Sequence, residues 1–150
     1  MTKKESTELT GRASLAQFGP GPWQDEPDRV EWRFEGFACL MVRQPDQGHW
    51  CGYVGLPPGH PWHGKDPDDA QVHGGITYGS PCEGVVCHVP QPGEPDEVWW
   101  LGFDCAHSGD LSPGSMQRYG WPPMSGTYKD RAYVEREVEQ LARQAAEAKP

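Results

Sequence analysis

The sequence has no long hydrophobic run. Its longest unbroken apolar stretch is the six residues from Phe37 to Val42, whereas a membrane-spanning helix needs about 20 apolar residues. The first 16 residues, MTKKESTELTGRASLA, carry lysines but no apolar stretch of the length found in secretory signals. We therefore expect a protein that has no membrane partner and lies in the cytoplasm.

Basic residues are scarce in the middle of the chain. Between Gln44 and Gln117 the only one is Lys65, against ten acids, so this segment alone carries a charge equal to the chain's net −9. Nucleic-acid binding takes its affinity from lysine and arginine side chains that neutralise phosphates. We therefore expect no nucleic-acid partner. An anion bound by this segment would need a metal ion or backbone N–H groups beside it.

Cysteines are few and odd in number. Five cysteines do not make a complete disulfide framework, and a reducing cytoplasm keeps thiols reduced. We expect reduced thiols, mostly buried as small apolar side chains, at Cys39, Cys51, Cys82, Cys87 and Cys105. Two weaker alternatives are a zinc site at Cys82, Cys87 and His88, and a Cys105 thiolate paired with a histidine.

Glycine and proline, in contrast, are abundant. The 150 residues include 19 glycines and 16 prolines, close to a quarter of the chain, which excludes a helical bundle and favours short strands joined by many turns. Seven tryptophans supply large apolar side chains for a core. The length fits a single domain.

The hydrophobic pattern predicts a sheet of about five strands and one helix. Strand candidates lie at 29–35, 37–43, 49–56, 72–78, 83–89 and 97–104. Apolar residues then repeat at helical spacing, at Val134, Val138, Leu141 and Ala145, behind Thr127 as the capping residue, which predicts a helix over about 128–147.

We therefore expect an α+β domain over residues 29–150, with an antiparallel or mixed sheet and the C-terminal amphipathic helix packed on one face. Residues 1–28 are polar and then rich in proline and glycine, a composition that predicts a flexible N-terminal arm.

Histidine and aspartate gather in loops beside strand ends. Imidazole and carboxylate ligands suit a divalent metal ion such as zinc or manganese, and such an ion can turn water into a nucleophile. The predicted metal ligands are His60, His63, His73, Asp104 and His107. Asp110 would orient a ligand or act as a base, and Lys65 would meet an anion. In the alternative interpretation these residues only stabilise turns.

Other motifs are weaker. His73-Gly74-Gly75 resembles the glycine-rich oxyanion turn of lipase-like esterases, but no Gly-x-Ser-x-Gly nucleophile motif follows. A Walker loop and a GxGxxG turn are also absent. Trp62 and Trp121 lie in proline-rich segments. If exposed there, their rings could bind a small molecule or a protein by stacking.

Three stretches, GYVGLPPGHPWHGKD, VHGGITY and VWWLGFDCAHSGD, together with the final helix, resemble a family of small uncharacterised proteins of tailed phages, prophages and bacteria. The resemblance covers roughly residues 49–145 and implies a cytoplasmic or phage-encoded protein, in the host cytoplasm if phage-encoded. The residues themselves favour a metal-dependent hydrolase of a small phosphate-bearing molecule. The alternative is a non-catalytic module that binds a small molecule or a protein, such as a phage counter-defence protein.

Overall fold

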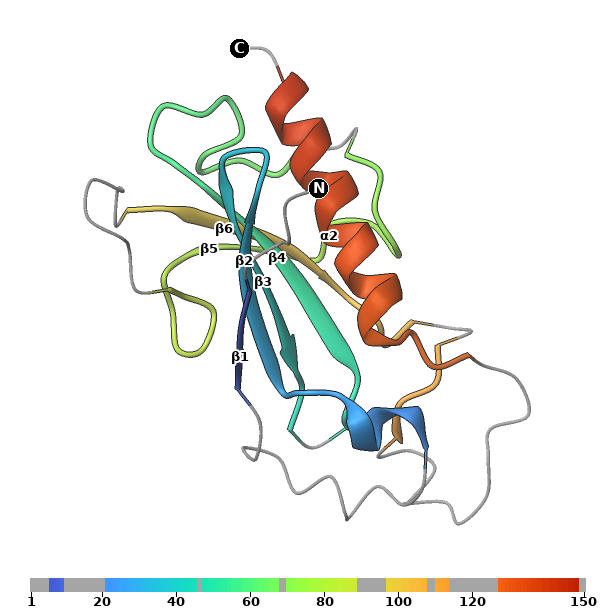
Figure 1. Cartoon of the computed structure of the whole chain (residues 1–150). Helices are drawn as coiled ribbons and strands as arrows, with labels where there is room; N and C mark the ends of the chain where they lie inside the picture. The colour runs from blue at the N-terminus through green and yellow to red at the C-terminus, as the bar shows by residue number, and fades with distance from the viewer. Residues whose placement is uncertain are drawn as a thin grey trace, which may run out of the picture.

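A single antiparallel sheet and one helix make up the fold. The computed structural model describes residues 6–9, 21–45, 47–67, 70–88, 97–107, 110–113 and 127–148. The strands are β1 (Ser6–Leu9), β2 (Arg29–Phe34), β3 (Phe37–Arg43), β4 (Trp50–Leu56), β5 (Tyr78–Pro81) and β6 (Trp99–Asp104), in the order β1-β2-β3-β4-β6-β5. Helix α2 (Arg131–Glu147) lies across one face (Figure 1). The α+β prediction is confirmed, with six strands in place of about five.

Two predicted strands are wrong. Residues 72–77 form a turn, closed by the Val72 carbonyl and the Gly75 amide, and positive φ angles at Gly74 and Gly75 take the chain out of extended geometry. The strand begins only at Tyr78. Residues 83–88 fold back on themselves as a tight turn with one isolated bridge between Glu83 and Val86, and residue 89 lies outside the described residues.

The helix begins three residues later than predicted. Asp130, in place of Thr127, is the capping residue, because its side chain accepts a hydrogen bond from the Tyr133 amide. Thr127 instead accepts a bond from Leu111 through its carbonyl. The predicted apolar stripe is confirmed as buried. Among the described residues, no helix has the length and apolar character that a membrane span requires.

Parts of the predicted arm contact the domain. β1 pairs with β2, and η2, a short 3-10 helix (Pro22–Asp25), buries Trp23. Asp28, only 2% exposed, lies 3.2 Å from the guanidinium of buried Arg43, which also donates to the Gly48 carbonyl. The flexibility of residues 1–28 stays a prediction, but Trp23 and Asp28 are packed as part of the domain.

The prediction that all five cysteines are thiols is wrong for two of them. Cys82 and Cys87 form a disulfide with their Cα atoms 4.7 Å apart. Cys39 and Cys105 are buried and Cys51 is half-buried, and none of the three is in a disulfide. The pairing was missed because residues five positions apart come within reach only where the intervening chain turns back, which strand periodicity does not reveal.

Gly52 sets the distance between α2 and the sheet. A Cβ atom at this position would lie 2.5 Å from Val138 Cγ2 and 2.8 Å from the Phe103 ring. Valine in a helix has little rotamer freedom with which to move aside. Gly52→Ala is therefore expected to destabilise the protein by about 1–3 kcal/mol, the usual cost of overpacking, measured by chemical denaturation.

Gly55→Ala in the same strand is the control. Its Cβ would lie 3.2 Å from Trp100, on the other face of the sheet, so a smaller loss is expected. Adding Val138→Ala to Gly52→Ala removes the methyl groups in the way, and the double variant should lose less than the sum of the two single losses. Additive losses would contradict this account of Gly52.

Candidate functional site

The long loop after β4 lies along α2. His60 Nε2 is 2.8 Å from the Ala145 carbonyl near the end of the helix. Farther along, the Gln144 side chain accepts from the Gln71 amide and donates to the Gln71 carbonyl, both at 2.7 Å. The His73 amide then donates to Glu137 at 2.8 Å. This segment runs beside the helix in Figure 1. Its bonds to Tyr133 and Glu137 place His73 beside the N-terminal half of α2.

Both ring nitrogens of His73 have partners. Nδ1 lies 2.8 Å from the Tyr133 hydroxyl, and Nε2 lies 2.8 Å from the carboxylate of Asp110. An ionised carboxylate only accepts hydrogen bonds, so Nε2 carries a proton; in neutral His73, Nδ1 then accepts from the tyrosine. This arrangement fixes the orientation of the imidazole.

Asp110 joins three segments of the chain through one carboxylate. Its side chain is 2% exposed and accepts from His73, from the His107 amide at 3.0 Å and from Lys129 Nζ at 3.2 Å. Burial raises the pKa of Asp110, but the bonds from His73, the His107 amide and Lys129 lower this pKa by more, so the net direction is downward. Asp110 is therefore an ionised anchor, which favours its predicted orienting role over the role of a base.

The second His–Asp pair is more accessible. His107 Nε2 lies 3.2 Å from Asp104 Oδ1, and the two side chains are 34% and 33% exposed. Asp104 also accepts from the Thr77 hydroxyl at 3.2 Å. The rings of His73 and His107 are 5.9 Å apart. His73, Asp104, His107 and Asp110 together form the His/Asp cluster. Its largely buried pair is His73–Asp110, with side chains 16% and 2% exposed, and its partly exposed pair is His107–Asp104; they are called the buried pair and the exposed pair below.

Two buried residues lie behind the cluster. His49 is 8% exposed, and burial lowers its pKa even though Asp104 and Asp110 act to raise it. His49 is thus kept neutral near pH 7. Burial also raises the pKa of Cys105, which is 2% exposed, and Asp110 raises it further. A reactive Cys105 thiolate, the weaker alternative from the sequence, has no support in this environment.

The other three predicted site residues lie elsewhere. His60 contacts α2 twelve residues beyond Tyr133, about 18 Å along the helix. His63 Nε2 is 2.9 Å from the Glu97 carbonyl, near the opposite end of β6 from Asp104. Lys65 lines a hollow whose lining includes none of the four cluster residues. The structure therefore does not bring His60, His63 and Lys65 to the cluster, because their loop is held along its length by bonds to α2 and β6.

The predicted metal centre is not preformed. Within the described part of the chain, no group of three or more His, Cys, Asp or Glu side chains is placed to hold a metal ion. In the His/Asp cluster the imidazoles face their own carboxylates rather than a common point. Two further carboxylates of the loop after β4, Asp68 and Asp69, lie outside the described residues.

A hollow of about 220 Å³ adjoins the exposed pair. Its lining residues are Lys65, Asp66, Ile76, Thr77, Tyr78, Gly79 and Trp99. Thr77 connects the two features, since it lines the hollow and its hydroxyl donates to Asp104. Trp62, whose ring could bind a ligand by stacking only if exposed, is half-buried against the core, and Trp121 lies outside the described residues.

Sequence reasoning missed several contributors to the site. Tyr133, Glu137 and Lys129 contact the cluster from the helix and from the residues before it. Each is a common residue type on or next to an amphipathic helix, so periodicity alone does not mark it. The one sequence signal for this site was the glycine pair after His73. Glycine at position 74 has no side chain, which leaves room for the His107 ring close to His73.

Comparisons with known proteins gave no match. No family model matches the chain, and no significant similarity was found to a curated protein or to a solved structure.

Gly74→Ala is expected to displace His107 and to destabilise the protein more than Gly75→Ala. Both glycines have positive φ, 69° and 83°, so both alanines carry a similar backbone cost of about 1–2 kcal/mol. Only at Gly74 would the Cβ meet the imidazole, 2.3 Å from His107 Nε2. Chemical denaturation and the NMR resonances of the histidine rings measure the two effects. Equal effects of the two substitutions would contradict a steric role for Gly74.

Asp110→Asn is expected to cost about 1–3 kcal/mol of stability near pH 7, because hydrogen bonds to a charged acceptor are lost. The pKa of Asp110 is lower in the folded state than the ordinary 3.8, so its stabilisation is present above that value and is lost as the pH falls toward the folded pKa.

The stability difference between wild type and Asp110→Asn should therefore shrink between about pH 5 and pH 2. Urea unfolding over this range is the measurement. Asp66→Asn, at an exposed carboxylate, is the control and should change the stability little at any of these pH values. A constant difference for Asp110→Asn would show that its charge does not stabilise the fold.

Proposed function

We propose that the chain is a hydrolase of a small phosphate-bearing molecule, with the His/Asp cluster as its reactive centre. One observation carries this proposal: a buried His–Asp pair supports an exposed His–Asp pair, beside a hollow that Lys65 lines. In many enzymes, two groups of the same chemical type have different roles because their environments differ. Here the buried pair would position the site and the exposed pair would carry out acid–base chemistry.

His107 is the general base of the proposed reaction. Its side chain is a third exposed. Nε2 is buried and faces Asp104, which stabilises the imidazolium that forms when the other ring nitrogen, Nδ1, takes a proton. A water oxygen gives that proton to His107 and bonds to phosphorus, while the bond from phosphorus to the leaving oxygen breaks. His107 then returns the proton to the leaving oxygen. His73 and Asp110 hold the His107 backbone in place and are positioning residues.

The hollow would bind the substrate. Lys65 supplies a positive charge for a phosphate, and Trp99 and Tyr78 supply aromatic surface for the rest of the molecule. Thr77, between the hollow and Asp104, would place the scissile bond near His107.

In the metal-dependent form of this proposal, the reaction also uses a bound zinc or manganese ion. His73, Asp104 and His107 are the predicted ligands that lie together, and side-chain rotation away from their present partners would free their nitrogen and oxygen atoms. The ion would lower the pKa of a bound water and help to neutralise the phosphate, which the acidic middle of the chain otherwise repels.

A non-catalytic small-molecule-binding module is the second candidate. The hollow favours it, because aromatic surface beside a Lys65–Asp66 pair can bind a ligand without any reaction. A role in phage counter-defence would be one use of such binding.

The test combines metal analysis with a hydrolysis screen. Protein purified without a metal-affinity tag is assayed for bound metals, then for hydrolysis of p-nitrophenyl phosphate, bis-p-nitrophenyl phosphate and nucleotides, with and without added zinc or manganese. We expect hydrolysis, with kcat/KM at least about 100-fold lower in His107→Ala, the usual effect of losing a general base. In the metal-dependent form, both His73→Ala and His107→Ala also lose bound metal.

His63→Ala is the matched control, since this histidine lies near the far end of β6 and should leave kcat unchanged. Lys65→Gln should raise KM more than it lowers kcat. Calorimetric binding of nucleotides without turnover would support the binding module and overturn the hydrolase. Neither hydrolysis nor binding would overturn both.

A further inference from the structure

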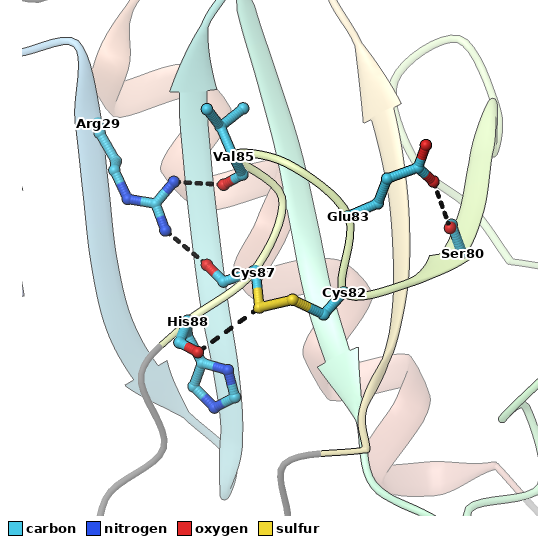
Figure 2. The surroundings of a disulfide bond; sticks show 7 residues. All are labelled: Arg29, Ser80, Cys82, Glu83, Val85, Cys87 and His88. Atoms are coloured by element: carbon cyan, nitrogen blue, oxygen red, sulfur yellow. Dashed lines mark hydrogen bonds between the residues drawn. A yellow bond between two sulfur atoms is a disulfide. The ribbon is translucent and has the colours of Figure 1, made fainter.

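The face of the sheet opposite α2 has its own apolar cluster. The buried members are Leu40, Val42, Tyr53, Val86, Val98 and Trp100. All but one come from the sheet or the residue before β6. The exception is Val86, which is 7% exposed and belongs to the disulfide loop, residues 82–88. Figure 2 shows this loop in front of the strands, with the helix behind them.

The disulfide closes the loop around the turn that presents Val86. Cys82 and Cys87 are bonded, and between them Glu83 and Val86 exchange two backbone hydrogen bonds, both of 3.1 Å. Val85, at the tip of this turn, is 45% exposed. The covalent ring therefore restricts the loop to the geometry in which Val86 points to the sheet.

Arg29, on β2, holds the loop to the sheet. Its guanidinium donates to the carbonyl oxygens of Val85 and Cys87, as the dashed lines in Figure 2 show. Both acceptors are backbone atoms, so these two bonds form together only when the turn has the shape that the disulfide imposes. The loop is thus held by one covalent bond, one apolar side chain and one charged donor.

We propose that Cys82–Cys87 is a reversible redox site that fixes the disulfide loop over this face when oxidised and releases it when reduced. Cys82 is exposed and Cys87 half-buried, so the site is open to a thiol. A thiolate of a small dithiol attacks one sulfur and breaks the disulfide, and the departing sulfur takes a proton. The second thiol of the reagent then displaces the cysteine from the mixed disulfide, leaving two cysteine thiols and an oxidised reagent.

The location predicted from the sequence makes a switch a better interpretation than a permanent cross-link. In a cytoplasm, an exposed disulfide is reduced unless its reduction potential is well below that of the cellular thiols. The disulfide and thiol states of Cys82 and Cys87 would therefore interchange with the redox state of the cell. Release would also loosen β5, because this edge strand ends at Pro81, directly before Cys82. The proposal does not depend on any catalytic role of the His/Asp cluster.

Hydrogen exchange of the full chain with and without dithiothreitol is the test. In the oxidised protein, thiol titration in denaturant should find three of the five cysteines reactive. Reduction should speed exchange at the Glu83 and Val86 amides roughly thirtyfold, the factor that loop-closure entropy gives for so small a ring. Exchange in β5 should also rise, while the amides of α2 and β3 keep their protection.

Two variants separate the disulfide from general effects of the reagent. Cys82→Ala/Cys87→Ala should exchange like the reduced protein and ignore dithiothreitol. Cys51→Ala, which removes a half-buried thiol on the same face but keeps the disulfide, should respond like wild type. Five reactive thiols without reductant, equal exchange in both states, or unfolding of the whole chain on reduction would each overturn the proposal.

Discussion

Helix α2 can lie against β3 and β4 only because Gly52 leaves room for Val138, and the rest of the structure depends on this contact. The apolar stripe of α2 packs on one face of the sheet. The polar side chains on the two sides of this stripe then contact the neighbouring segments of the chain. One flank holds the loop after β4, through Glu137, Tyr133 and the Ala145 carbonyl. The other bonds Trp32 of β2 through Glu139.

The His/Asp cluster is a consequence of that arrangement. A buried carboxylate is costly unless donors surround it, and Asp110 has an imidazole, an amide and an ammonium group as partners. These donors come from the loop beside α2, from the segment after β6 and from the residue before the helix cap. Asp110 therefore ties together segments distant in sequence, and it leaves His107 and Asp104 as the exposed pair beside the hollow.

The elements with strong patterns were predictable and those set by turns were not. The alternation at 29–34 and the density of apolar residues at 37–43 and 50–56 gave strands within a residue or two of their observed bounds. The same approach failed at 72–77 and 83–88, because the side-chain pattern does not report the positive φ at Gly74 or the cross-link at Cys82. Likewise, residue type and position in loops put all the predicted site residues in one group, and the structure brings together only His73, Asp104, His107 and Asp110.

The sequence by itself determined the α+β class, the buried stripe of the helix and the presence of histidine and aspartate at strand ends, because these follow from local composition and periodicity. Tertiary structure alone decided which of those residues meet. The bonds along α2 carry His73 to Asp110 and leave His60 about 18 Å away along the helix. It also decided that Cys82 and Cys87 pair, since distance in space depends on the path of the whole chain between and around the residues.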